Sequence, residues 1–182
     1  RLISGFARGI PREYNVHNVP QAQSRARFEE AYDIIMKAWT EEVFSHEGRF
    51  WSYHDVAIWP RPLQQPHPPF WYASSNEIGS TWAGEHGLHY VTLGPTPFAK
   101  KNIEAYKAAL GKRGAPAQPK AEFSGGAVVG VMRHVFVADT DAEAHRFAKA
   151  PMEQHLANLN WLRVKHGVTG LRSGLNGPRG AT

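Results

Sequence analysis

The sequence predicts an α/β protein in which helices cover a parallel β-sheet. Short apolar runs bounded by glycine or proline alternate along the chain with longer segments whose apolar residues recur every three or four positions. Alternation of strands and helices is typical of parallel sheets. Four main strands in this order fit either a small open sheet or part of a barrel, and periodicity alone leaves both interpretations open.

The first strand is expected at residues 2–7, an apolar run that ends in Ala-Arg-Gly. Residues 10–20 contain two prolines and are predicted to be a loop. A helix should follow over about 22–39, because one face of that segment is apolar and the opposite face is charged. Its apolar stripe consists of Phe28, Ala31, Tyr32, Ile35 and Trp39.

A β-hairpin and an extended segment are expected after this helix. Glu47 and Gly48 form a turn signal, and strand-like pieces lie around 49–53 and 55–59. Five prolines between residues 60 and 69 exclude a helix there.

The third predicted unit is a buried strand that runs directly into a helix. Residues 70–73 are apolar throughout, as expected for a strand covered on both faces. Ser74, Ser75 and Asn76 then supply good N-cap chemistry for a helix over about 77–86.

Two further strand–helix pairs complete the pattern. A strand is predicted at 88–93, and a helix should begin at Thr96 and end before a loop at 111–120. The Val-rich run 127–138 is the longest predicted strand. A last helix should start at Asp139-Thr140-Asp141 and reach about 163, interrupted or kinked near Pro151. Residues 1–164 are therefore expected to form one incomplete domain, and 165–182 a flexible glycine-rich tail.

Composition narrows the class of protein. The chain has 182 residues and no cysteine, which excludes disulfides, cysteine-ligated metals and a thiol nucleophile. The net charge of +5 comes from scattered basic residues among acidic ones, so we expect no nucleic-acid partner. No apolar run is long enough for a membrane span, and no signal peptide is recognisable. The absence of cysteine fits a cytoplasmic protein. Because the chain starts within a strand and without Met, we expect it to be one piece of a longer protein.

Candidate binding residues lie where predicted strands end, since ligands of parallel α/β sheets bind at the carboxyl ends of the strands. Arg8 follows the first strand, and its guanidinium suits a phosphate. Ser74 and Ser75 precede a helix whose free N–H groups attract anions. The alternatives are an ordinary surface arginine and plain helix capping.

His134 is the candidate for acid–base chemistry. In a strand, a period of two residues would place Gly130, Met132, His134 and Phe136 on one face. If that face is the interior of a barrel, His134 is available as an acid, a base or a hydrogen-bond donor to substrate. The alternative is a histidine that is satisfied locally. None of the other histidines has the spacing of a metal motif, so no metal site is expected.

Several runs in this order resemble the bacterial-luciferase-like flavin-dependent monooxygenase family. They include Gly5-Phe-Ala-Arg-Gly9, Arg12-Glu-Tyr14, Ser24-Arg-Ala-Arg-Phe-Glu-Glu30, Phe44-Ser-His-Glu-Gly-Arg-Phe50, the proline-rich segment 60–69, Ala73-Ser-Ser75 and Val137-Ala-Asp-Thr-Asp-Ala-Glu-Ala144. The resemblance covers residues 1 to about 150. It implies a partial (β/α)8 TIM barrel that contributes about strands 4–7, their helices and a β-hairpin insertion. The tail at 165–182 would then fall where the family has a mobile lid.

The resemblance also implies a function for the candidate residues. Arg8, Arg25, Ser74 and Ser75 match positions that hold the flavin phosphate. His134 falls where alkanesulfonate-type members carry an active-site histidine. Those members have an arginine two residues earlier, where this chain has Met132, so a sulfonate substrate is not expected.

The implied activity is that of an FMN-dependent monooxygenase, as part of a longer chain. Its reduced FMN would come from a separate flavin reductase, with O2 as co-substrate and a small organic molecule as substrate. A homodimer is a further expectation. Two alternatives stay open: a deazaflavin-dependent oxidoreductase with the same fold, and a non-catalytic flavin-binding homologue or fragment.

Overall fold

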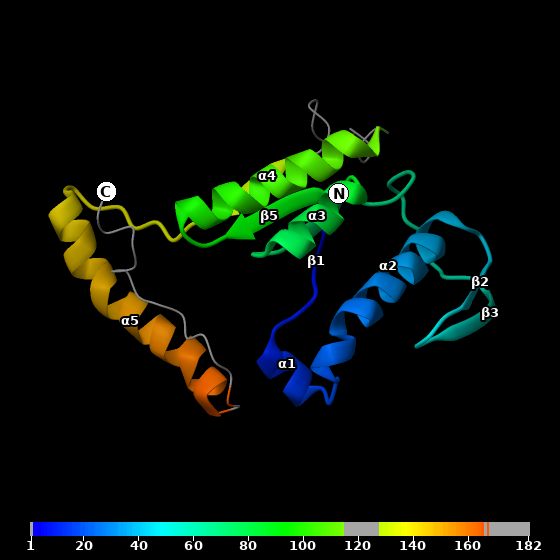
Figure 1. Cartoon of the computed structure of the whole chain (residues 1–182), viewed down its shortest axis with the longest axis horizontal. Coiled ribbons are helices and arrows are strands. Elements are labelled where there is room, and N and C mark those ends of the chain that lie inside the picture. The colour runs from blue at the N-terminus through cyan, green and yellow to red at the C-terminus, as the bar shows by residue number, and fades with distance from the viewer. Residues whose placement is uncertain (1, 115–127, 166, 168–182) are drawn as a thin grey trace.

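The computed structural model of the chain describes residues 2–114, 128–165 and 167 (Figure 1). Their main feature is a four-stranded parallel sheet in the order β1–β4–β5–β6. The strands are β1 (Ser4–Ala7), β4 (Phe70–Ala73), β5 (His89–Leu93) and β6 (Val129–Met132). The predicted parallel α/β arrangement is confirmed.

The helices of the described residues are α1 (Pro11–Val16), α2 (Ser24–Thr40), α3 (Glu77–Glu85), α4 (Thr96–Arg113) and α5 (Asp141–Lys165), with a short 3-10 helix η1 (Gln21–Gln23). In Figure 1, α3 and α4 lie together beside β5, and α2 runs along the other side of β1. The helix α5 stands apart at the opposite side of the molecule from α2. No helix in the described parts of the chain is long and apolar enough to cross a membrane.

The core is aromatic and lies between the sheet and helices α2, α3 and α4. Phe70 and Tyr72 alternate along β4 with the less buried Trp71 and Ala73, which is the side-chain period of a strand. Because the covered face is filled by rings in edge-to-face and stacked contacts, α2 is fixed to the sheet mainly through side-chain packing. These rings belong to Phe6, Phe28, Tyr32, Trp39, Phe70, Tyr72, Trp82, Tyr90 and Tyr106.

The predicted loop at 10–20 is wrong in part, because residues 11–16 form α1. Proline is well tolerated at the start of a helix, where its missing N–H has no helical partner to lose. The Glu13 carboxylate accepts a hydrogen bond from the N–H of Ile10 at 2.9 Å and so caps this short helix.

The hairpin exists, but its strands are β2 (Phe44–Glu47) and β3 (Ser52–Val56), not the predicted 49–53 and 55–59. The Glu30 carboxylate explains the shift. It accepts hydrogen bonds from the N–H groups of Arg49, Phe50 and Trp51 at 2.9–3.1 Å. These residues therefore form the turn, since their N–H groups are bound to a side chain of α2 and cannot enter a strand ladder.

The ends of one helix and one strand in the second half of the chain also differ from prediction. The helix α4 continues to Arg113 and stops at Gly114, whose φ of +64° is the left-handed conformation typical of a helix end. The strand β6 ends at Met132, and residues 133–138 form no regular element. Val135 and Val137 are 79% and 84% exposed, so their strand propensity is not realised in the absence of a neighbouring strand.

The last helix was predicted correctly in its extent but not in its interruption. Helix α5 continues through Pro151 without a break. The predicted tail at 165–182 lies almost entirely outside the described residues.

Candidate functional site

The two strand ends that carry candidate residues lie side by side. Strands β1 and β4 are parallel neighbours, with Ala7 paired to Ala73. Arg8 and Ser74 therefore leave the sheet next to each other, at its carboxyl edge. Adjacent carboxyl ends of parallel strands are the usual place for ligands in such sheets.

The chain turns sharply after Arg8, and the turn is held in place. Gly9 has a φ of +93°, a conformation that favours glycine. The hydroxyl of the buried Tyr14 donates a hydrogen bond to the carbonyl oxygen of Arg8 at 2.8 Å. The Arg8 side chain itself is exposed, so its guanidinium is open to a ligand.

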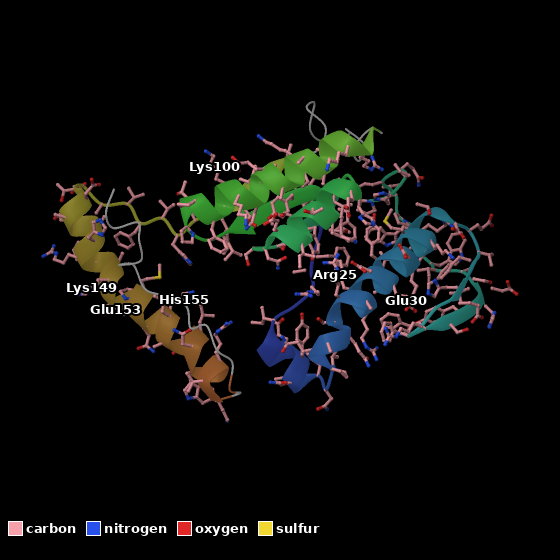
Figure 2. The ribbon with its side chains drawn as sticks, in the orientation of Figure 1. Arg25, Glu30, Lys100, Lys149, Glu153 and His155 are labelled. Carbon is pink, nitrogen blue, oxygen red and sulfur yellow. The ribbon has the colours of Figure 1, made fainter. Side chains whose placement is uncertain are left out.

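Arg25 lies in the first turn of α2, with its guanidinium 2.6 Å from the Glu29 carboxylate one turn later. The two side chains are 40% and 38% exposed. Figure 2 labels Arg25 between α2 and the elements of the sheet, well away from α5. This guanidinium has the exposure needed to bind an anion, but it already has a counterion.

Tyr72 is the common neighbour of both arginines. Burial raises the pKa of the Tyr72 phenol above its ordinary value of 10, while the positive charges of Arg8 and Arg25 act in the opposite direction. Glu29 and Tyr14 act on the same phenol. Both guanidinium groups are therefore within electrostatic range of the Tyr72 ring. That Arg8 and Arg25 bind one ligand together stays a prediction.

The start of α3 adds polar groups to the same edge. Asn76 is the N-cap, and its side-chain oxygen accepts a hydrogen bond from the N–H of Gly79 at 2.9 Å. A helix leaves the N–H groups of its first turn without helical partners and carries a partial positive charge at this end. Both features favour a bound anion.

The two serines differ in role. The Ser74 hydroxyl is buried and accepts a hydrogen bond from the N–H of Asn76 at 3.3 Å. A side chain at Gly79 would collide with it, which shows how closely α3 approaches. Ser75 is exposed. Ser74 therefore shapes the strand–helix turn, and Ser75 supplies the accessible hydroxyl.

These residues together fit a phosphate group. Two guanidinium groups provide charge and directed donors, and guanidinium–phosphate hydrogen bonds are among the strong ones. The exposed hydroxyl of Ser75 and the N-terminal turn of α3 add neutral donors on the same edge.

His134 is not part of this group. It is exposed, lies two residues beyond the end of β6, and has its ring centroid 5.6 Å from that of His155 on α5. The face predicted from strand periodicity therefore stops before His134. Figure 1 places α5 on the other side of the molecule from α2.

A cavity of about 450 Å³ separates the His134 segment from α5. Its walls combine three imidazoles with apolar groups, and they include Phe136, Met152 and the side chains of His134, His145 and His155. Among the residues that the structure describes, no cluster of three histidine, aspartate or glutamate side chains is arranged to hold a metal ion.

Two residues next to the candidate arginines, Tyr14 and Glu29, were not predicted from the sequence to be part of this site. Tyr14 was noted only as part of a motif, because its bond to the Arg8 carbonyl depends on the shape of a turn. Glu29 gave a clearer signal, since it stands four positions after Arg25 on a predicted helix, the spacing of an ion pair.

A parallel sheet flanked by helices, with basic and polar residues at its carboxyl edge, is typical of ligand-binding α/β folds, among them α/β barrels. The chain belongs to the luciferase-like monooxygenase family, whose family model matches residues 1–173. The predicted family and the partial-barrel fold are thereby confirmed.

Named relatives are flavin enzymes. An FMNH2-dependent dimethylsulfone monooxygenase of Pseudomonas putida is 29% identical over 144 residues, which are 79% of this chain and 37% of that protein. The oxygenase component of a flavin-dependent trigonelline monooxygenase of Acinetobacter baylyi is 26% identical over 147 residues, 79% of this chain and 39% of that protein.

A solved structure shares the fold. It is the oxygenating constituent of 3,6-diketocamphane monooxygenase from a plasmid of Pseudomonas putida, in complex with FMN. The TM-score is 0.66 at 23% identity, over 91% of this chain and 49% of the other. The chain spans about half or less of the length of the proteins it matches.

Proposed function

We propose that this chain supplies the flavin-phosphate side of an FMN-dependent monooxygenase that oxidises a small organic substrate. The observation that carries the proposal is that Arg8 and Ser74 leave adjacent strand ends beside the start of α3, with Arg25 on α2 close enough for its charge to act on Tyr72 of the same strand. The named relatives support FMN as the cofactor, since one depends on FMNH2 and a protein of the same fold was solved with FMN.

Each residue has a distinct part in cofactor binding. Arg8 and Arg25 bind the phosphate through charged hydrogen bonds, and Ser75 with the first turn of α3 adds neutral ones. Ser74 keeps α3 close to β4 through its buried hydroxyl. When bound, reduced FMN supplies the reaction with O2, while the protein places it and excludes water.

His134 and the cavity beside it are the proposed substrate side. An imidazole in the wall of a largely apolar cavity can exchange a proton with a bound substrate. His134 then acts as an acid or base on a small organic molecule, in the assembly that the longer chain completes.

A flavin reductase is the proposed partner. The trigonelline relative is named as an oxygenase component, and the diketocamphane protein as an oxygenating constituent. A component that only oxygenates needs reduced flavin from another source, and we infer that a second protein provides it. Location in the cytoplasm, where NADH is present, and assembly as a homodimer belong to the same proposal.

The full-length protein tests the proposal. It is titrated with FMN, riboflavin and a deazaflavin, and O2 uptake is then followed with NADH and a flavin reductase. We expect FMN to bind more tightly than riboflavin, because only FMN carries the phosphate, and O2 uptake to require the reductase. Binding of the deazaflavin alone would favour the alternative oxidoreductase. Binding of none of the three would refute a flavin function.

A further inference from the structure

We infer that Tyr14 is a positioning residue that holds Arg8 and the segment leading to Arg25 in place for the flavin phosphate. This inference rests on the proposed function. Tyr14 is not expected to touch the phosphate itself, since its hydroxyl is already used inside the protein.

Tyr14 forms one hydrogen bond with the segment of Arg8 and another with the segment that leads into the helix of Arg25. Its hydroxyl donates to the carbonyl oxygen of Arg8 at 2.8 Å, directly after β1. Its own carbonyl oxygen accepts a hydrogen bond from the N–H of Val19 at 2.8 Å, in the segment that leads into α2. One buried residue thus connects the end of a strand with the approach to the helix that carries Arg25.

The turn after Arg8 is built around the Tyr14 ring. A side chain at Gly9 would come within 3.1 Å of the ring carbon Cε1, so the ring packs directly against the turn. The helix α1 has only six residues and is too short to be stable by itself. Its position therefore depends on such tertiary contacts, and the hydrogen bond from the Tyr14 hydroxyl to the Arg8 carbonyl oxygen is one of them.

The direction of Arg8 follows from this bond. Its side chain is exposed, so packing does not orient the guanidinium. The peptide group after Arg8 is fixed by the Tyr14 hydroxyl, and this sets the direction in which the side chain leaves the backbone. If the bond is removed, the turn gains freedom, and more entropy is lost when a ligand orders Arg8.

The test compares Tyr14→Phe with the wild-type full-length protein. Phenylalanine keeps the ring and the main-chain bond to Val19 and removes only the hydroxyl. We expect the dissociation constant for FMN to rise about three- to tenfold, as for the loss of one neutral hydrogen bond, while the constant for riboflavin stays unchanged. The matched control is Tyr53→Phe on β3, which should alter neither constant.

A double variant separates this positioning role from a general structural one. If Tyr14 acts through Arg8, then Tyr14→Phe should have no further effect on FMN binding once Arg8 is alanine. Equal weakening of FMN and riboflavin, or full additivity of the two changes, would overturn the inference. If the wild-type protein does not prefer FMN to riboflavin, the phosphate site itself fails, and that outcome is seen before any variant is made.

Discussion

At the scale of single residues, Arg25 already has a counterion in Glu29, and the proposed flavin phosphate would be a second partner. Its guanidinium is 2.6 Å from the Glu29 carboxylate, on a helix face where spacing alone favours the pair. A flavin phosphate has to compete with this carboxylate for the same donors. Exposed ion pairs contribute little free energy, so the phosphate can win this competition.

Replacement of Arg25 by alanine tests its role in binding. We expect FMN affinity to fall by about 1–3 kcal/mol, nearer the lower value because the side chain is partly exposed, since a charged hydrogen bond is lost. Riboflavin affinity should not change. Fluorescence titration of the full-length protein measures both constants, and Arg146→Ala on α5 is the control. Unchanged FMN affinity would remove Arg25 from the site.

Glu30 is the residue that fixes the hairpin turn. Burial raises the pKa of its carboxyl, but hydrogen bonds from the N–H groups of Phe50, Trp51 and Arg49 and from His46 lower it more, so the net pKa lies below the ordinary 4.5. Because the pKa is lower in the folded protein, the ionised carboxylate stabilises the folded state at every pH above the ordinary pKa of 4.5. That stabilisation is lost as the pH falls through the lowered pKa.

Glu30→Gln should therefore lower the urea midpoint at pH 7, and the difference from wild type should shrink as the pH falls below about 4.5. Urea unfolding at several pH values, followed by tryptophan fluorescence, measures this. Glu104→Gln is the control, because that exposed carboxylate is 3.9 Å from Lys100 and accepts no such set of N–H groups. A difference that grows in acid would contradict the assignment.

The candidate residues at strand ends and helix starts could be found in the sequence, because glycine, proline and helix-capping residues mark these positions. Arg8, Arg25 and Ser75 were singled out through the resemblance, and their contact with flavin stays a prediction. The burial of the Ser74 hydroxyl under Gly79 was not predictable, since it depends on how closely α3 approaches β4. The position of His134 also failed to follow from its strand period, because β6 ends before it.

At the scale of elements, α3 and α4 pack closely against each other. Gly84 allows this contact, because a side chain there would lie 2.5 Å from the carbonyl oxygen of Tyr106 and 2.8 Å from the Ala109 side chain. Backbone that is tied into a helix cannot move aside at low cost.

Gly84→Ala should destabilise the protein by about 1–3 kcal/mol through overpacking. Gly111→Ala on α4 is the matched control, because no atom lies within 4 Å of the added carbon, and alanine should stabilise the helix by up to about 1 kcal/mol. Chemical unfolding of both variants gives the comparison. Equal effects of the two changes would show that helix propensity, not packing, decides.

Tyr106 joins the same helix to the sheet. Its hydroxyl donates to the carbonyl oxygen of Leu88 at 2.7 Å, and burial raises the pKa of the phenol from 10 to about 12. The unfolded chain therefore releases this proton at lower pH than the folded chain. The Tyr106 contribution to stability is complete below pH 10 and declines as the pH rises from 10 towards 12.

Tyr106→Phe should cost about 1 kcal/mol at pH 8, the usual loss for one buried hydrogen bond. The difference from wild type should become smaller between pH 10 and pH 12, since phenylalanine does not titrate. Unfolding midpoints at pH 8, 10 and 11 measure it, with the exposed Tyr53→Phe as control. A difference that is independent of pH would mean that the buried phenol titrates normally.

Element types were predictable where packing and periodicity agreed, as in α2 and β4. They were not predictable where a contact with a residue distant in the sequence determines which residues form a strand. The strands of the hairpin lie at other residues than predicted, because Glu30, about twenty residues earlier in the sequence, binds the N–H groups of three consecutive residues that form the turn. The Val-rich run after β6 lacks a strand partner, and local preference alone did not make it a strand.

At the scale of the whole molecule, the described sheet is open. Strands β1 and β6 are its outermost members, and each presents one row of backbone groups without a neighbouring strand of the sheet. Val131 and Met132 on β6 are exposed as well. Open edges of this kind pair with other chains unless they are covered.

The chain of 182 residues should therefore self-associate, whereas a longer protein that closes the barrel should do so less. Sedimentation velocity at rising concentration measures this for both forms, and we expect larger species for the shorter one alone. Val131→Lys places a charge on the β6 edge, which should reduce association, because charged side chains hinder edge pairing. Val43→Lys, exposed just before the hairpin, is the control and should leave association unchanged. A chain of 182 residues that stays monomeric at all concentrations would mean that the edges at β1 and β6 are protected, and would contradict the expected edge pairing.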